Sequence, residues 1–264
     1  MFAVLHALRA DHSVGINRTI MAIALVLLLG QATVATSAAK ATSPLESGVI
    51  TIEGTVFSPL TREMIGGANV EFIDSRTGQV IAETTSSAMG VFTIDLPFDG
   101  KPIEAYMRGS KDGFLTTLVF PPEALTHDIG DCPPFVHTND CMNIALLTDA
   151  QADFMAGLAG VERDPAMGEV LFLAVGCDGR PVAGATIAIA PKPEVIAYTN
   201  GPFPNPSAEA TDGSGRAFGF NMKPGRATIR VRYPDGSTGI SHIRIEANAV
   251  SIASTFPQNA HCSR

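Results

Sequence analysis

The sequence predicts an all-β fold made of two tandem seven-stranded β-sandwiches, and three observations carry this prediction. Glycine (25 residues) and proline (18 residues) are frequent, which indicates many turns. Short segments of alternating apolar and polar residues fill the chain after Gly48. One turn-and-strand phrase also occurs twice, as REMIGGANVEFID at 62–74 and as DGRPVAGATIAIA at 178–190.

The first copy contains strand-like segments separated by glycine and proline turns such as SRTGQ and PFDGKP. In VFTIDL, the side chains at 91, 93 and 95 face one way and those of Phe92, Ile94 and Leu96 face the other, so we expect the latter three to face a core. The predicted strands are VITIEGTVF, ANVEFID, QVIAETT, GVFTIDL, IEAYMRG, FLTTLVF and MNIALLT.

The second copy shows the same density of strand signals. Ile229 and Val231 alternate with Arg230 and Arg232, which predicts one dry and one solvated face. The predicted strands are EVLFLAVG, ATIAIA, EVIAYT, RAFGFNM, RATIRVRY, TGISHIRIE and VSIASTF. About seven short strands per copy are typical of a sandwich of roughly 100 residues.

The two copies align in register. Ala68 matches Ala185, and Gly90 matches Gly215, each ahead of a phenylalanine-bearing strand. The extra residues of the second copy fall in the proline-rich TNGPFPNPSAEA, which we interpret as an insertion in a loop.

A short helix is predicted between the copies. Thr148 or Asp149 is a suitable N-cap, Gly157 and Gly160 weaken the end of the helix, and Pro165 prevents its continuation. Such a linker would let two sandwiches tilt or dock. The predicted organisation is therefore a first sandwich at 48–148, a linker helix at 149–165 and a second sandwich at 166–264.

The N-terminus has the pattern of a secretory signal peptide. MAIALVLLL follows Arg18 and precedes the small-residue run GQATVATSAAKA. The apolar core is shorter than the roughly 20 residues of a bilayer span, although an uncleaved anchor remains the alternative. We expect a signal peptide at 1–39, a flexible tail at 40–47, and a secreted or periplasmic mature protein without a lipid anchor.

Export makes disulfides the expected state of the four cysteines. Cys132 and Cys141 are close in sequence, and Cys177 and Cys262 would then join the beginning and end of the second copy. Four cysteines allow three connectivities, so this pairing rests on proximity alone. Thiolate binding of a metal is the alternative, but the chain has no CxxC pair.

The composition argues against two classes of partner. The formal net charge of −8 disfavours binding to a nucleic-acid backbone. The chain has no tryptophan and only three tyrosines, which leaves few aromatic platforms for stacking on sugars or bases.

The duplicated phrases resemble the carboxypeptidase regulatory-like domain. The likeness rests on IEGTVFSPLTREMIGGANVEF with SSAMGVFTIDLP, and on DGRPVAGATIAI with TDGSGRAFGFNMKPG. It covers most of 48–125 and 168–255. It implies a transthyretin-like (prealbumin-like), Ig-like sandwich grouped with carbohydrate-binding-like folds, and a carbohydrate or envelope polymer as a partner. The first copy departs from the pattern, because it lacks a Pro-Gly turn after DLPFDGK and carries the excursion 121–141.

The physical roles of the shared residues are structural. Gly67 and Gly184 allow a sharp turn into a strand, Phe92 and Phe220 are expected to fill the cores, and Pro224 is expected in a turn.

The excursion holds the richest polar cluster of the chain. It contains His127, Asp128, Asp131, His137 and Asp140, residue types that bind divalent metals. Their spacing matches no compact ligand motif, so a solvated loop is the preferred interpretation. TDGSG at 211–215 is expected to be a plain turn, and His242 an exposed or satisfied strand residue.

We therefore expect a non-enzymatic, exported binding, adhesion or structural module, with no catalytic, metal or cofactor site. Its partner would be a cell-envelope or extracellular protein or polysaccharide. The alternatives are a metal-dependent ligand binder or hydrolase that uses 127–140, and a membrane-anchored accessory domain.

The signal-peptide prediction is testable on the exported protein. Mass spectrometry of its N-terminus is expected to find a chain that begins near Lys40, because cleavage follows the small-residue run. A mature protein that still begins at Met1 would establish the anchored alternative.

Overall fold

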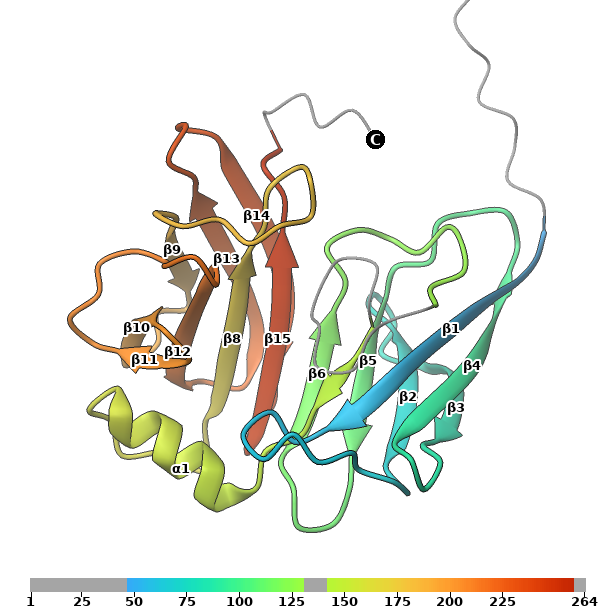
Figure 1. Cartoon of the computed structure of the whole chain (residues 1–264). Coiled ribbons are helices and arrows are strands. Elements are labelled where there is room, and N and C mark those ends of the chain that lie inside the picture. The colour runs from blue at the N-terminus through green and yellow to red at the C-terminus, as the bar shows by residue number, and fades with distance from the viewer. Residues whose placement is uncertain (1–46, 131–141, 259–264) are drawn as a thin grey trace, which may run out of the picture. The chain divides into compact units, whose positions relative to one another are not determined.

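A computed structural model describes residues 47–130 and 142–258 (Figure 1). The predicted signal peptide and tail lie outside these residues. In the first half of the chain, each predicted strand segment contains a strand. The strands are β1 (Gly48–Phe57), β2 (Asn69–Asp74), β3 (Val80–Thr85), β4 (Val91–Phe98), β5 (Ala105–Ser110), β6 (Thr116–Phe120) and β7 (Ile144–Ala145).

The predicted strand segments of the second half also each contain a strand. The insertion adds the short strand β11, which the sequence did not predict. The elements are α1 (Asp149–Leu158), β8 (Gly168–Ala174), β9 (Thr186–Ala190), β10 (Val195–Asn200), β11 (Phe203–Asn205), β12 (Arg216–Met222), β13 (Gly225–Arg232), β14 (Thr238–Ile245) and β15 (Ala249–Thr255).

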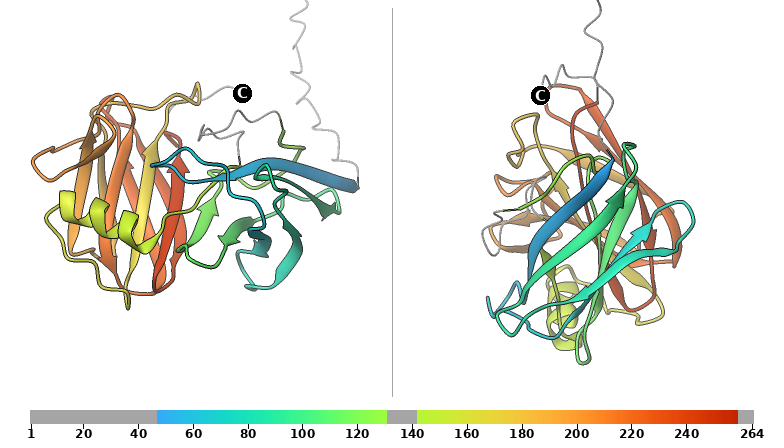
Figure 2. Two further views of the ribbon diagram at one scale, coloured as in Figure 1. Left: turned by 60° about the horizontal axis from the view of Figure 1, so that its bottom comes forward. Right: turned by 90° about the vertical axis from the view of Figure 1, so that its right-hand side faces the viewer.

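One nine-stranded sheet runs through both halves, in the order β11-β10-β12-β8-β15-β6-β5-β2-β3. Its central step is the parallel pairing of β15 with β6, in register from Ala249↔Thr116 to Ala253↔Phe120 (Figure 1). The sequence predicted two sandwiches joined by a linker that would let them tilt or dock. In the structure a backbone ladder joins the halves (Figure 2), because β6 and β15 each offered an unpaired edge.

Two three-stranded sheets cover opposite faces of this long sheet. The sheet β4-β1-β7 shares one core with Val119 and Ile252, whereas the sheet β14-β13-β9 shares a second core with their neighbours Leu118 and Ala253. Because consecutive strand residues point to opposite faces, the two cores lie on opposite sides of the long sheet.

Both cores draw side chains from both halves. The first core contains Leu173, Val250 and Phe256 of the second half, and the second core contains Tyr106 and Phe120 of the first half. The rings of Tyr106 and Phe120 stack with their centroids 4.9 Å apart. Neither half therefore buries its apolar face alone.

The strand pairing repeats between the halves. β1 pairs antiparallel with β4 and parallel with β7, and β8 pairs antiparallel with β12 and parallel with β15. Likewise β5 lies between β2 and β6, and β13 lies between β9 and β14. The third strand differs, because β3 pairs with β2 whereas β10 pairs with β12.

The repeated phrase builds the same hydrogen-bonded turn twice. In the first half, Ala68 N–H donates to Ser86 Oγ at 2.9 Å, and that hydroxyl donates to the carbonyl of Ile65 at 2.9 Å. In the second half, Ala185 N–H donates to Thr211 Oγ1 at 2.9 Å, and that hydroxyl donates to the carbonyl of Val182 at 2.7 Å. Ser86 and Thr211 are each 4% exposed, and their hydroxyls tie a turn to the start of a strand.

The matched glycines have a steric reason. Gly90 and Gly215 have φ angles of 74° and 66°, which non-glycine residues rarely adopt. A Cβ atom at either position would lie within 2.7 Å of a backbone carbonyl oxygen, of Val56 and Ala174 respectively. The alignment of the two copies is therefore confirmed at the atomic level at these turns.

The alternation predicted for β4 and β13 is confirmed, since Phe92, Ile94, Leu96, Ile229 and Val231 are buried. Phe220 is also buried, but it lies in a separate cluster with Ala156, Ala159 and Val161, next to α1 and away from the core between the sheets. The other face of β12 packs in the second core, so Phe220 points away from that core and towards α1.

The hydroxyls of Ser86 and Thr211 are expected to stabilise the fold by a measurable amount. Thr211→Val keeps the side-chain volume but leaves the buried Ala185 N–H and Val182 carbonyl without their shared partner, and we expect a loss of about 1–3 kcal/mol in the free energy of unfolding. Ser86→Ala should give a loss of the same order in the first half. Denaturant unfolding measures both, and Thr61→Val, at an exposed position, is the control. A loss below about 0.5 kcal/mol in both variants would show that these hydroxyls do not hold the turns.

Candidate functional site

The polar excursion does not form a metal site in the part that the structure describes. Asp128 Oδ1 accepts a hydrogen bond from the backbone N–H of Thr51 at 2.8 Å, and the exposed His127 contacts Thr126 Oγ1 at 3.1 Å. Among residues 47–130 and 142–258, no three potential ligands gather closely enough to hold a metal ion. Asp131, His137 and Asp140 lie outside the described residues.

The predicted disulfides stay predictions. Cys132, Cys141 and Cys262 lie outside the described residues. Cys177 lies in the exposed turn after β8 and is not a free thiol.

The remaining polar candidates have structural roles. His242 is exposed on β14 and its Nδ1 lies 3.2 Å from Thr228 Oγ1. The TDGSG segment is a turn whose Asp212 accepts hydrogen bonds from Ser214, Thr199 and the backbone of Gly201. Burial raises the pKa of Asp212, but these hydrogen bonds outweigh it and hold the pKa at about 2.

The feature with the geometry of a binding site is an apolar cleft of about 420 Å³ over the centre of the long sheet. A volume of this size suits a small-molecule or side-chain ligand. The cleft lies where the cover provided by β1 and β7 ends and the cover provided by α1 begins. Its lining residues are Phe57, Pro59, Leu60, Arg62, Ala145, Leu147, Met155, Glu169, Val170, Leu171, Pro202, Phe203, Arg216, Phe218, Phe220, Val250 and Ile252.

The floor of the cleft consists of side chains on one face of three adjacent strands. Glu169 pairs with Val250 and Leu171 pairs with Ile252 across the β8–β15 ladder, so these four share a face. Phe218 pairs with Leu171 from the other side and extends that face onto β12. The floor of the cleft therefore comes from strands of the second half. One wall of the cleft comes from the first half.

Large apolar side chains stand exposed at the rim. Leu60 is 37% exposed and Phe203 is 39% exposed, and both line the cleft. The ring of Phe203 meets that of Phe154 edge to face, with the centroids 5.9 Å apart. Exposed apolar groups gathered at an opening are typical of a surface that receives a ligand.

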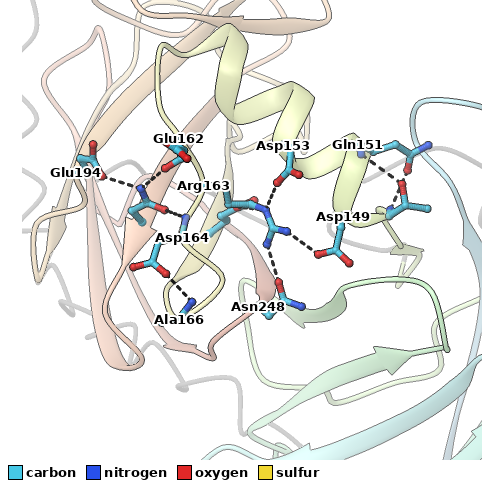
Figure 3. A network of polar contacts seen from close by, with 12 residues as sticks. Asp149, Gln151, Asp153, Glu162, Arg163, Asp164, Ala166, Glu194 and Asn248 are labelled. Atoms are coloured by element: carbon cyan, nitrogen blue, oxygen red, sulfur yellow. Dashed lines mark hydrogen bonds and ion pairs between the residues drawn. The ribbon is translucent and has the colours of Figure 1, made fainter.

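Helix α1 forms one wall and is held by a single guanidinium (Figure 3). The N-cap is Thr148, one of the two predicted candidates, and it forms a capping box with Gln151. Arg163 donates to Asp149 at 2.6 Å and to Asp153 at 2.7 Å, both on α1, and to Asn248 at 2.6 Å beside β15. The buried Arg163 therefore fixes the helix over the sheet.

Glu169 is the unusual residue of the cleft. Its side chain is 8% exposed, and its Oε1 lies 3.8 Å from Arg163 Nε and has no hydrogen-bond partner among residues 47–130 and 142–258. Burial raises the pKa of this carboxyl to about 7, and the nearby Arg163 lowers it only in part. A buried carboxyl without a full set of hydrogen-bond partners lowers the free energy of unfolding. Such a group is therefore a candidate for a role in binding.

The sequence interpretation did not single out this site. A glutamate at the start of the apolar run EVLFLAV was a visible signal, because a fully buried strand rarely carries a charged residue. The cleft itself was not predictable, since its walls come from segments far apart in the chain.

Within the described residues, no helix combines the length and apolar character that crossing a membrane requires.

Comparison with known proteins gives distant structural matches only. No family model matches the chain, and no curated protein matches it. Among solved structures, the TIE protein of Bacillus anthracis aligns over 79% of this chain with 14% identity and a TM-score of 0.27, and this chain covers 34% of that protein. The chain thus spans about a third of the TIE protein.

Two pilins also align. The shaft pilin SpaA of Lactobacillus rhamnosus GG aligns over 81% of this chain and 99% of its own, with 11% identity and a TM-score of 0.24. The minor pilin GBS52 of Streptococcus agalactiae aligns over 81% of this chain and 100% of its own, with 15% identity and a TM-score of 0.24. Likenesses at these TM-scores carry no argument about function.

The environment of Glu169 predicts how stability depends on pH. Because the folded pKa of about 7 lies above the ordinary glutamate pKa of 4.5, the folded state holds the proton more tightly than the unfolded chain. The contribution of Glu169 to the free energy of unfolding is therefore fully present below about pH 4.5. It is lost as the pH rises towards 7. Glu169→Gln removes this loss, and we expect it to raise the free energy of unfolding at pH 8 by up to roughly 3 kcal/mol.

Denaturant unfolding of both proteins from pH 4.5 to pH 8 measures the difference. Glu209→Gln, in an exposed loop, is the matched control for the change in charge and should keep the pH slope of the unmodified protein. Parallel pH profiles for Glu169→Gln and the unmodified protein would contradict the prediction.

Proposed function

We propose that the chain is an exported, non-enzymatic structural and adhesion module in which both sandwich-like halves act as one rigid body. In this proposal each half is a carboxypeptidase regulatory-like domain, and the module works in the cell envelope or outside the cell. The observation that carries the proposal is the β6–β15 ladder at the centre of the nine-stranded sheet.

A spacer or adhesion module must hold its two ends at a fixed distance. The β6–β15 ladder supplies this constraint, because backbone hydrogen bonds join the halves directly. The shared cores add to it, since a tilt between the halves would pull Phe120 and Val250 out of apolar surroundings.

Buried polar groups support a structural role in the same way. Ser86 and Thr211 hold the repeated turns, and Asn143 Oδ1 accepts hydrogen bonds from both the backbone N–H and the hydroxyl of Thr55 at 2.8 Å. Asp128 Oδ1 accepts a hydrogen bond from the backbone N–H of Thr51. These groups serve the scaffold.

The proposed partner is a cell-envelope or extracellular protein or polysaccharide. The N-terminal signal-like segment and the cysteine content support export. The net charge of −8 is consistent with a partner other than nucleic acid.

The cooperativity of unfolding tests the rigid body. Phe98→Ala removes a side chain, 8% exposed, that belongs only to the first core, and Phe120→Ala removes one of equal exposure from the second core although it sits on β6. We expect each variant of the mature protein to lose about 3–5 kcal/mol in a single transition. In both variants amide hydrogen exchange should accelerate in both halves together.

Independent halves would give a different pattern. In Phe98→Ala, the amides of β9, β13 and β14 would then keep their full protection while those of the first half lose theirs. Two separate unfolding transitions would likewise sink the proposal of one rigid module.

A further inference from the structure

We propose that the cleft over β8 and β15 binds an elongated amphipathic molecule, with a hydroxyl that donates to Glu169 at one end and an anionic group that pairs with Arg216 at the other. This inference goes beyond the structural role, because a rigid module could exist with or without such a ligand. It rests on the arrangement of the cleft floor and on the unpartnered oxygen of Glu169.

The two polar side chains lie at opposite ends of the same strand face. Arg216 pairs with Leu173 across the β12–β8 ladder, and Leu173 lies four residues along β8 from Glu169. At about 3.3 Å per residue, the two positions are separated by roughly 13 Å along the strand. A chain of about ten carbon atoms spans this distance.

The surface between the two ends is apolar. Leu171, Phe218 and Ile252 share the floor, and Phe57 and Met155 belong to the walls. An alkyl chain laid along β8 would bury its methylene groups against them, and removing these groups from water favours binding.

The Glu169 end requires a hydrogen-bond donor. Glu169 lines the cleft, and its buried Oε1 has no hydrogen-bond partner among the described residues, because Arg163 Nε at 3.8 Å is too far away to donate to it. A hydroxyl is a suitable donor because it can bond to this oxygen whether the carboxyl is neutral or ionised. An ammonium group is a poorer match, because the Arg163 guanidinium already stands beside the carboxyl.

The Arg216 end favours an anion. The Arg216 guanidinium lines the cleft and forms no ion pair with a described residue, and Arg62 lines the same cleft. A guanidinium at the mouth of an apolar cleft recognises carboxylate or phosphate oxygens by paired hydrogen bonds. The floor therefore presents a carboxyl and a guanidinium at the two ends of an alkyl-sized slot.

The test uses 10-hydroxydecanoate as the probe, with decanoate and 1-decanol as probes that each lack one polar end. Isothermal titration calorimetry of the mature protein, below the concentration at which the probes form micelles, is expected to give one site. Decanoate and 1-decanol should each bind about tenfold more weakly than 10-hydroxydecanoate, since decanoate loses the contact to the buried Glu169 and 1-decanol loses the contact to the half-buried Arg216.

Two variants assign the ends. Glu169→Leu should weaken 10-hydroxydecanoate about tenfold and leave decanoate unchanged, whereas Arg216→Gln should weaken both acids and leave 1-decanol unchanged. Val250→Phe fills the floor and should abolish binding of all three probes. Val80→Phe makes the same change at an exposed position on the edge strand β3 and should bind like the unmodified protein.

Methyl chemical shifts place the site without relying on any variant. Saturating 10-hydroxydecanoate should shift the methyl signals of Leu171, Val250 and Ile252 in the unmodified protein, and leave those of Ile229 and Val231 in the opposite core unchanged. The inference is overturned if binding is not saturable, if the shifts lie elsewhere, or if all three probes bind equally and Glu169→Leu changes none of them.

Discussion

The parallel pairing of β6 with β15 is the interaction on which the rest of the structure depends. It joins one five-stranded array and one four-stranded array into a single sheet. The sheets β4-β1-β7 and β14-β13-β9 then cover opposite faces of it. Because each cover reaches past its own half, each core takes side chains from both. The cover provided by β4-β1-β7 ends over the middle of the sheet, and the cleft opens at that end, so Val250 and Ile252 belong both to the first core and to the cleft floor.

The repeated phrase encodes a turn that must be built identically twice. A hydroxyl, from Ser86 or Thr211, accepts a hydrogen bond from one backbone N–H and donates one to a backbone carbonyl. Gly90 or Gly215 allows the turn to lie close to the neighbouring strand. A buried turn leaves no water to satisfy these backbone groups, so the hydroxyl is required in each copy. The repetition therefore specifies packing and carries no catalytic information.

The cleft combines a structural cost with a capacity to bind. Arg163 donates its hydrogen bonds to α1 and Asn248, and its guanidinium lies 3.8 Å from Glu169. Burial of the Glu169 carboxyl therefore destabilises the fold above neutral pH. A ligand hydroxyl would supply the missing donor. The stability of the fold and the proposed binding thus meet at one side chain, which is why the pH and ligand experiments report on the same group.

Sequence alone determined the strand segments other than β11, the register of the two copies and a helix N-cap at Thr148 or Asp149, because alternation, glycine turns and capping are local properties. It did not determine that the halves share a sheet, that β10 joins β12 while its counterpart β3 joins β2, or that Phe220 packs beside α1. Those outcomes depend on which edges and faces meet in space. The partner chosen by an unpaired edge strand is a long-range choice that no local pattern records, so the tertiary structure decided it, and with it the position of the cleft.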